Sequence, residues 1–195
     1  MIDRLINFIF KRTSVFYHFR NIIHNNFIEE KKILRKEFDK DKKTLDFGCG
    51  IGQYSYLFNN YLGVDIDKDN IEFARKKFNR KFQVIKNISD IKEKKFDQIF
   101  STMTLHHISD KELIIIFKEI SKLLNKNGKL LIIDHIEVRL QKNILGRFIL
   151  MNDRGKYFRN VYRLKNLFDK YFRITKLYYY KTGPFRDYVL ILNKK

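Results

Sequence analysis

Short apolar runs alternate with stretches of helical periodicity along most of this chain. Five runs have continuous or alternating apolar residues and are predicted to be strands, at 44–47, 61–64, 82–86, 96–101 and 129–134. The clearest helical pattern covers 110–124, where apolar residues recur at steps of three and four and Asn127-Gly128 supplies a stop. Weaker helical patterns cover 71–78 and a short stretch after Gly52. Strands that alternate with helices indicate an α/β fold built on a parallel sheet.

The pattern changes on both sides of this alternating region. Apolar side chains from Ile2 to Phe27 recur at mostly helical spacing, which predicts one or two amphipathic helices. A basic and aromatic stretch covers 136–160, and a helix is expected near 161–170. Two further strands, 173–181 and 188–192, flank the turn sequence Thr182-Gly183-Pro184, so we expect the sheet to finish with an antiparallel hairpin.

The chain is therefore expected to form a single domain over residues 1–195. We assign residues 1–40 to a helical lid or anchor and 41–135 to a ligand-binding core. Residues 136–195 then supply a substrate-side segment and the terminal strands.

Three glycines follow the first predicted strand on alternate positions. Residues 45–52 have the sequence LDFGCGIG, so a strand runs directly into the spacing G-x-G-x-G. Glycine lets the backbone turn sharply and lets a ligand approach main-chain atoms. The spacing differs from the G-x-G-x-x-G of dinucleotide-binding folds. Tight turns also need glycine, so the loop alone indicates either a turn or a nucleotide-like ligand.

An acidic residue ends the second predicted strand. Asp65 follows Gly63-Val64, 19 residues after Asp46. A carboxylate at this place can accept both hydroxyls of a ribose. The alternative for Asp65 is a turn or helix-capping aspartate before Lys68. Coupled to the glycine loop, the ribose interpretation is favoured.

With the glycine loop, the strand that ends at Asp65 and three further segments, this chain resembles class I S-adenosylmethionine-dependent methyltransferases. Within them it is similar to the small-molecule group related to quinone biosynthesis, methyltransferase type 11. The resemblance covers about residues 30–135. The matching segments are LDFGCGIG at 45–52, GVD at 63–65, NISD at 87–90, FDQIFS at 96–101 with LHHI at 105–108, and LLNKNGKL at 123–130. It implies a Rossmann-like α/β fold with an open, mostly parallel seven-stranded sheet and helices on both faces.

The resemblance also implies S-adenosyl-L-methionine as the cofactor. Its methionine part would lie against Asp46 and the glycine loop, its ribose against Asp65, and its adenine against Ile66. The family usually has Asp where Asn87 stands, so adenine recognition is expected to be weakened but retained, because an amide oxygen still accepts a hydrogen bond. The expected cofactor-binding residues are Asp46, Gly48, Cys49, Gly50, Gly52, Asp65, Ile66, Asn87, Ile88 and Ser101.

Two neighbouring histidines follow the fourth predicted strand. Ser101 and Thr102 end that strand, at the sheet edge where ligands bind in open α/β folds, and should face the reactive methyl group. His106 and His107 come next and are the candidate catalytic residues, since an imidazole can accept a proton near neutral pH. The plainer interpretation is one packed and one solvated histidine. No metal is expected, because a third ligand at metal-binding spacing is absent from the sequence nearby.

Basic residues are concentrated toward the C-terminus and bear on the substrate. The net charge is +19, and residues 135–195 hold 15 basic against 4 acidic side chains. A compositional bias explains many of the lysines, but it explains the asymmetry less well. Guanidinium groups suit carboxylates and phosphates, and the aromatic rings among them suit a planar or sugar-like molecule. The candidate substrate residues are Thr102, Arg154, Tyr157 and Arg159, for a small anionic or lipid- or carrier-linked acceptor.

Two other functions compete with this one. A basic stripe with aromatic residues also fits RNA, so an RNA methyltransferase, acting for example on tRNA, is the first alternative. A solvated basic face over an ordinary helix would explain the same residues without any ligand. A non-catalytic binding partner that keeps the cofactor fold is the second alternative, mildly supported by Asn87.

Composition and the N-terminal segment bear on location. The single cysteine, Cys49, offers no internal disulfide, and no apolar run reaches the roughly 18 residues that span a bilayer. A cytoplasmic location is therefore expected. The N-terminal helices are predicted to form a lid over the site. In the alternative, Arg4, Lys11, Arg12 and Arg20 meet acidic headgroups, which gives peripheral membrane contact. No sequence feature favours a particular oligomeric state.

Overall fold

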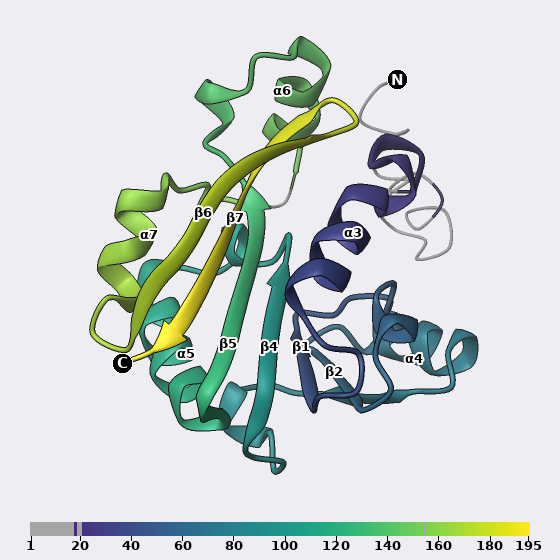
Figure 1. Ribbon diagram of the computed structural model, residues 1–195. Helices are drawn as coiled ribbons and strands as arrows, with labels where there is room; N and C mark the ends of the chain where they lie inside the picture. The colour runs from purple at the N-terminus through teal and green to yellow at the C-terminus, as the bar shows by residue number, and fades with distance from the viewer. Residues whose placement is uncertain (1–17, 19–20, 154) are drawn as a thin grey trace.

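One seven-stranded sheet organises the computed structural model, which describes residues 18, 21–153 and 155–195 (Figure 1). The strand order is β3-β2-β1-β4-β5-β7-β6, with β1 to β5 parallel and β7 antiparallel to both β5 and β6. The strands are β1 Thr44–Phe47, β2 Tyr61–Asp65, β3 Lys81–Val84, β4 Phe96–Thr102, β5 Leu124–His135, β6 Phe172–Thr182 and β7 Phe185–Lys194. The predicted fold class is confirmed, including the antiparallel C-terminal hairpin.

The order of the strands reverses next to β1. The chain runs from β1 outward to β2 and β3, then returns to the other side of β1 with β4. Asp46 of β1 is therefore paired with Gly63 of β2 on one side and with Phe100 of β4 on the other. In open α/β sheets the crevice for ligands lies at the carboxyl ends of the strands at such a reversal. This topology places the predicted ligand residues of β1, β2 and β4 at one edge.

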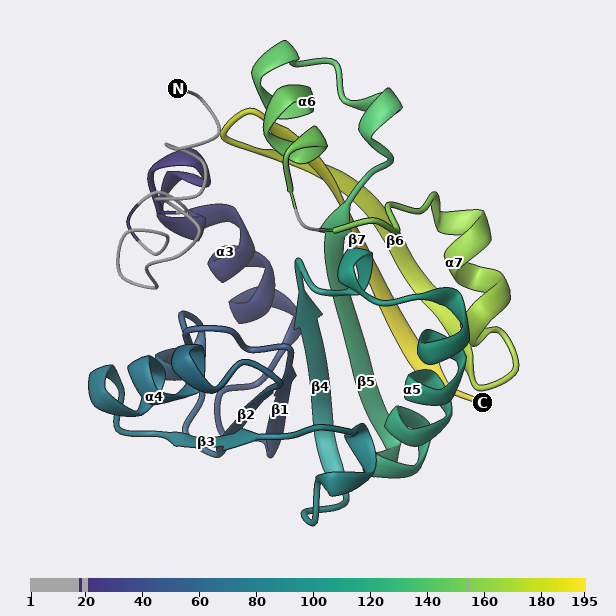
Figure 2. The ribbon, with the colours of Figure 1, turned by 180° about the vertical axis from the view of Figure 1, so that it is seen from behind.

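Helices cover both faces of the sheet, as Figures 1 and 2 show from opposite sides. Alternate residues of β5 illustrate the two cores: Leu130 and Ile132 belong to one hydrophobic cluster, Leu131 and Ile133 to the other. The first cluster includes apolar residues of α5 and α7, and the second includes those of α3 and α4. The helices are α3 Ile28–Glu37, α4 Lys68–Lys77, α5 Asp110–Leu123, α6 Ile144–Met151 and α7 Val161–Phe168.

The predicted helix at 110–124 is confirmed, but its predicted stop is wrong. Ser109 and Glu112 form a capping box at its start. The helix ends at Leu123 because Leu124 already pairs with Phe96 of β4. Gly128 lies within β5, where a Cβ atom would come 2.6 Å from the side chain of Leu124. This glycine therefore allows a close approach at the start of the strand.

A helix was not predicted within 136–160. α6 occupies this stretch, and its N-cap Asn143 accepts a hydrogen bond from the Gly146 N–H over 3.0 Å. Gly146 packs against the hairpin turn, since a Cβ there would lie 2.4 Å from the carbonyl oxygen of Pro184. α6 thus sits at the end of the molecule that carries the carboxyl ends of the parallel strands (Figure 1).

The N-terminal helical prediction is tested only in part. Residues 1–17, 19 and 20 lie outside the described residues, residues 21–23 are helical, and α3 begins only at Ile28, after the apolar pattern. α3 is fastened to the C-terminal hairpin by Tyr180, whose hydroxyl donates to Glu30 over 2.9 Å, and by Lys176, which bonds Glu37 over 2.8 Å. Within the described part of the chain, no helix has the length and apolar character needed to cross a membrane.

Candidate active site

The three glycines after β1 all adopt positive φ, but for different reasons. A Cβ at Gly48 would lie 2.3 Å from Thr104, and one at Gly52 would lie 2.6 Å from the Phe82 ring, so these two glycines permit close packing. A Cβ at Gly50 would meet nothing within 4 Å. Gly50 therefore presents backbone to open space, which is the property expected of a loop that receives a ligand.

Asp65 is tied directly to this loop. Its carboxylate accepts the Gly50 N–H over 2.7 Å and the Asp67 N–H over 2.9 Å. Burial raises the pKa of Asp65 against these hydrogen bonds. The helix cap is a different residue, because Asp67 accepts the N–H groups of Asp69 and Asn70 at the start of α4. The helix-capping alternative for Asp65 is thereby removed, whereas the turn alternative is supported, because Asp65 accepts the N–H of Asp67 two residues on.

Two buried polar atoms near the carboxyl ends of β1 and β4 have unmet hydrogen-bonding capacity. Asp46 is fully buried and accepts the Tyr61 hydroxyl through Oδ2 over 2.7 Å, and burial raises its pKa to about 8. Its Oδ1, like Oγ of Ser101, finds no hydrogen-bond partner among the described residues. Such atoms call for a polar ligand or water. Together with the open face of Gly50 and the Asp65 carboxylate, they fit a ligand with amino and hydroxyl groups, as S-adenosyl-L-methionine has.

The remaining cofactor candidates differ in exposure. Ile66 is 77% exposed just past β2, where a flat ring could cover it, and Asn87 is exposed after β3. Ile88 belongs to the hydrophobic core. Cys49 is buried in the loop, and burial raises the pKa of its thiol well above the ordinary value.

His106 lies beyond the end of β4, in the 3-10 helix Leu105–His107. Its Nδ1 is 2.5 Å from Oδ1 of Asp134, and its backbone N–H donates to Oδ2 of the same carboxylate. Burial alone would lower the pKa of His106, but Asp134 and then Asp153 outweigh it and raise the pKa to about 9. In this geometry His106 is an imidazolium at neutral pH, so it holds a proton rather than accepts one.

His107 and Asp153 complete the cluster. Nε2 of His107 is 3.8 Å from Oδ1 of Asp153, and Nε2 of His106 is 3.6 Å from the same oxygen. The side chain of His107 is 42% exposed, whereas that of His106 is 3% exposed. One histidine is therefore packed and the other reaches solvent, as the plainer interpretation expected, yet both border the same carboxylate.

The segment after Asp153 closes over His106. The Phe158 ring stacks on the imidazole with centroids 4.9 Å apart, and the Tyr157 N–H donates to the His106 carbonyl oxygen over 2.9 Å. A Cβ at Gly155 would lie 2.2 Å from the His106 ring, so only glycine permits this approach. Sequence patterns did not single out Asp134, Asp153 or Gly155, because their partners lie far away along the chain.

One of the predicted acceptor residues, Arg159, lies inside the fold. Arg159 is 3% exposed, and its guanidinium bonds Asp110 and three backbone carbonyl oxygens, of Leu105, Ile108 and Tyr157. These hydrogen bonds go to residues of the protein itself, so Arg159 fixes the segment that carries the two histidines. Tyr157 is 38% exposed. Arg154 lies outside the described residues.

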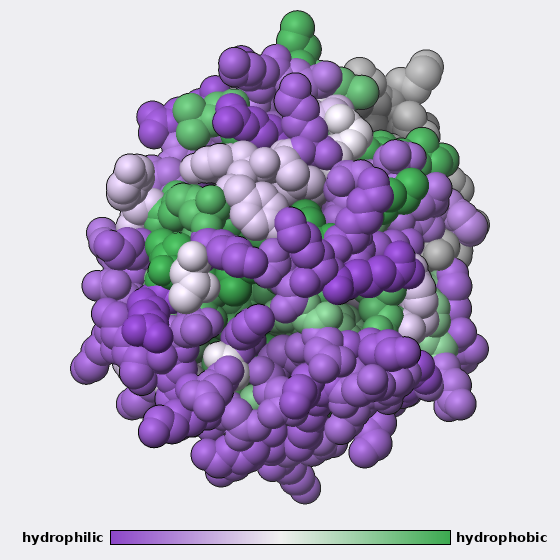
Figure 3. Space-filling model, viewed as in Figure 1, coloured by the Kyte–Doolittle hydropathy of each residue, from purple (hydrophilic) through white to green (hydrophobic). Residues whose placement is uncertain are grey.

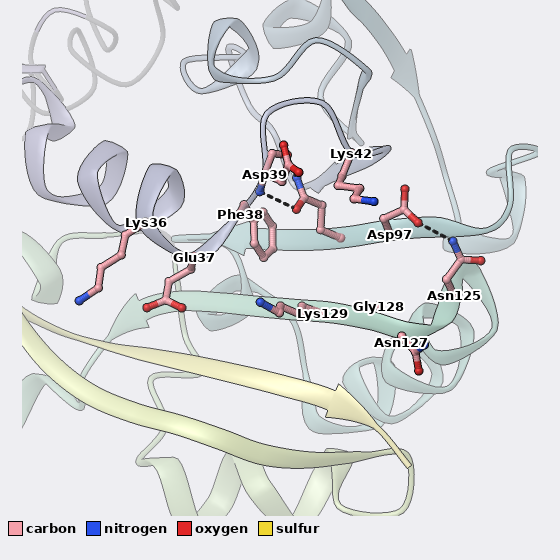
Figure 4. Close-up of a pocket in the computed structure, with 11 residues that line it drawn as sticks. Lys36, Glu37, Phe38, Asp39, Lys42, Asp97, Asn125, Asn127, Gly128 and Lys129 are labelled. Atoms are coloured by element: carbon pink, nitrogen blue, oxygen red, sulfur yellow. Dashed lines mark hydrogen bonds between the residues drawn. The ribbon is translucent and has the colours of Figure 1, made fainter.

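A hollow on the surface lies away from these residues. It has a volume of about 460 Å³ and lies where α3 ends and where β4 and β5 begin (Figure 4). Asp97 and Asn125 are hydrogen-bonded to each other at its rim. This is the amino end of the parallel strands, opposite the edge where open α/β sheets bind their ligands. We therefore place the active site at the glycine loop and the histidine cluster.

Known proteins match both the sequence and the fold. A family model described as "Methyltransferase domain" matches residues 38–172. The uncharacterized protein MJ1252 of Methanocaldococcus jannaschii is 30% identical over 103 residues, which cover 52% of this chain and 40% of that protein. An uncharacterized methyltransferase of Bacillus mycoides is 28% identical over 132 residues, 63% of this chain and 56% of the relative. The matches thus span about half the length of these relatives.

Solved structures share the fold at low sequence identity. A SAM-dependent methyltransferase from Archaeoglobus fulgidus superposes with a TM-score of 0.74 at 18% identity, covering 92% of this chain and 99% of that one. Magnesium protoporphyrin IX methyltransferase from Synechocystis, solved with bound SAH, gives a TM-score of 0.71 at 16% identity, covering 99% and 100%. The chain therefore belongs to the methyltransferase domain family, and it shares the fold of these solved methyltransferases.

Proposed function

We propose that this protein transfers a methyl group from S-adenosyl-L-methionine to a small anionic acceptor that is linked to a lipid. The observation that carries the proposal is the single edge of the sheet that joins the open glycine loop to the histidine cluster. The loop follows β1, Asp65 ends β2, and the cluster follows β4 and β5. A cofactor bound at the first part would direct its reactive end toward the second.

The cofactor supplies an activated methyl group, so the protein mainly has to position the two reactants. We assign Asp65 to the ribose hydroxyls and the Gly50 backbone, with Asp46, to the amino-acid end. Ile66, Asn87 and Ile88 are assigned to the adenine. The unpartnered hydroxyl of Ser101 and the neighbouring Thr102, both buried at the end of β4, would border the methyl group.

The acceptor is assigned to the space bordered by the histidine cluster and the 155–158 segment. The His106 and His107 side chains are the polar groups that can hold the nucleophilic atom of the acceptor. His106 carries positive charge, which favours a developing or resident negative charge beside it. Tyr157 adds a partly exposed ring at the same place.

The lipid link is supported by the outer face of α6. Ile144, Leu145, Phe148 and Met151 recur at helical spacing and are 84%, 59%, 51% and 70% exposed. Exposed basic side chains of Lys142 and Arg147 lie among them. Hydrophobic side chains also reach the surface at the end of the molecule that carries α6 (Figure 3). An apolar face edged by cations suits the surface of an anionic membrane.

A label-transfer experiment tests this function. Purified protein is incubated with methyl-labelled cofactor and an extract of the source cells, and label is counted in organic-soluble, small aqueous and acid-precipitable fractions. Label in the organic fraction is expected, and it should be lost in the Asp65→Ala variant. Ribonuclease-sensitive precipitable label would replace the proposal with an RNA acceptor. Failure to bind S-adenosyl-L-homocysteine, together with no transfer, would leave a non-catalytic binding protein.

A further inference from the structure

Three potential metal ligands converge at the acceptor side of the sheet. One ligand atom from each of His106, His107 and Asp153 can be chosen so that all three lie within 4.8 Å of one another. Oδ1 of Asp153 is 3.6 Å from Nε2 of His106 and 3.8 Å from Nε2 of His107. Ligands bonded to one ion at about 2.0 to 2.2 Å stand somewhat over 3 Å apart. A small closure of the cluster would therefore bring the three atoms around a common point.

The first of these ligands is already oriented. Asp134, which is 1% exposed, bonds Nδ1 of His106 over 2.5 Å and accepts the backbone N–H groups of His106 and His135. A carboxylate on the far nitrogen of an imidazole is the usual support of a metal-binding histidine, because it fixes which nitrogen faces the ion. Here the Asp134 carboxylate occupies Nδ1 of His106, so that Nε2 faces Asp153 and His107.

The third ligand is held in place by its own turn. The Gly155 N–H donates to Oδ1 of Asp153 over 2.6 Å. Gly155 lies against the His106 ring with no room for a Cβ, so the position of Asp153 relative to His106 depends on this glycine. The cluster thus joins the histidine segment to the turn that carries Asp153, and these two segments are far apart along the chain.

We propose that His106, His107 and Asp153 bind one divalent first-row transition-metal ion. Two imidazoles and one carboxylate suit Zn²⁺, Co²⁺, Mn²⁺ or Fe²⁺, whereas Mg²⁺ prefers oxygen ligands. Binding of the ion at Nε2 releases the proton that His106 otherwise holds there, and the carboxylates of Asp134 and Asp153 then balance the charge of the ion. The sequence predicted no metal because Asp153 is remote from the histidines along the chain.

The use of the ion in catalysis rests on the proposed function. Three protein ligands leave coordination positions open. An oxygen of the anionic acceptor bound there would release its proton more readily and remain beside the methyl group. Metal binding itself is independent of this use and can be measured without any acceptor.

The test uses the full chain with no histidine tag. Binding of Co²⁺ is followed by its visible absorption and binding of Zn²⁺ by calorimetry, with Mg²⁺ for comparison. We expect one equivalent of Co²⁺ or Zn²⁺ and none of Mg²⁺. The His107→Ala and Asp153→Asn variants should weaken binding by more than about 100-fold, since even a residue that only supports a ligand contributes about 10- to 100-fold. Gly155→Ala, which keeps all three ligands, should also weaken it.

Matched variants separate the site from general effects. His18→Ala and Asp169→Asn change an exposed histidine and an exposed carboxylate outside the cluster and should leave binding unchanged. The proposal is overturned if the native chain binds no Co²⁺ or Zn²⁺, or if binding persists in the three cluster variants. S-adenosyl-L-homocysteine affinity is measured on the same samples. If the native chain binds this compound but no Co²⁺ or Zn²⁺, the metal site alone is rejected. If the native chain binds the metal but not this compound, the proposed function alone is rejected.

Discussion

The hydroxyl of Tyr61 donates to the buried carboxylate of Asp46 across 2.7 Å, from the strand next to β1. This is the only hydrogen bond that the described residues give to the Asp46 side chain. One bond does not offset the loss of hydration, so burial raises the pKa of Asp46 to about 8. The protonated, neutral form of the Asp46 carboxyl is therefore favoured below about pH 8 before a cofactor binds.

A pH dependence of stability follows for Asp46. Because its folded-state pKa lies above the value in the unfolded chain, the unfolded state releases a proton that the folded state keeps between about pH 4 and about pH 8. The contribution of Asp46 to stability therefore falls as the pH rises through that window. Urea unfolding from pH 4 to pH 9 should show the native chain losing stability relative to Asp46→Asn. Parallel curves for the two proteins would contradict this.

Asp65 and Asp67 should separate cofactor binding from helix stability. Asp65→Ala is expected to weaken S-adenosyl-L-homocysteine binding by about 10- to 100-fold, because it removes charge-assisted hydrogen bonds to the ribose. Asp67→Ala removes the N-cap of α4 and should cost about 1 kcal/mol of stability with no change in affinity. Calorimetry and urea unfolding measure the two effects, and equal affinity losses would argue against the ribose assignment.

Two glycines of the same loop should respond differently to alanine. Both have positive φ, which costs about 1 to 2 kcal/mol for an L-residue. Gly52→Ala also forces a Cβ against the Phe82 ring, so it should lose more folding stability than Gly50→Ala, whose Cβ meets open space. Gly50→Ala should instead weaken S-adenosyl-L-homocysteine binding by about tenfold or more through a lost 1.4 kcal/mol. A well-folded Gly50→Ala variant with native affinity would place the cofactor elsewhere.

Arg159 and Arg163 share the carboxylate of Asp110 but differ in burial. Each approaches it to 2.7 Å, with side chains 2% and 59% exposed. Arg159→Met leaves the carbonyl oxygens of Leu105, Ile108 and Tyr157 without this donor, while Asp110 keeps Arg163, and it should cost about 1 to 3 kcal/mol of stability. Arg163→Met should cost no more than about 1 kcal/mol. Similar losses in urea unfolding would show that the burial of Arg159 is unimportant.

The exposed face of α6 should bind anionic membranes. Replacement of both Leu145 and Phe148 by serine is expected to reduce binding to phosphatidylglycerol vesicles by at least about tenfold, because two apolar side chains no longer enter the interface. Tyr162→Ser, which changes a still more exposed ring on α7, is the control. Vesicle flotation measures the effect. Native binding by the double variant would remove the lipid link from the proposed function.

Local sequence patterns predicted the strands and the glycine loop well, because their signals lie within a few residues. The five parallel strands were identified within a few positions, apart from β5, which begins five residues earlier than expected. α6 was missed because its apolar residues surround the helix instead of forming one stripe. Periodicity indicates a helix only when one face is polar.

The histidine cluster shows where such prediction stops. His106 and His107 were found as neighbours in sequence, but Asp134 comes from β5 and Asp153 from the segment after α6. Arg159 was assigned to the substrate on its charge, whereas the fold buries it against Asp110. Composition gives the charge of a side chain and says nothing of its partners. Those partners are set by the order of the strands.

The position of β7 has a consequence for the order in which the chain can fold during synthesis. β6 leaves the ribosome before β7, yet it joins the sheet only through β7, which lies between it and β5. Until β7 emerges, the nascent protein has an open β5 edge and an unpaired β6. Open edges of apolar strands invite pairing with other chains. A nascent chain paused before β7 emerges therefore exposes strand edges that β7 later covers.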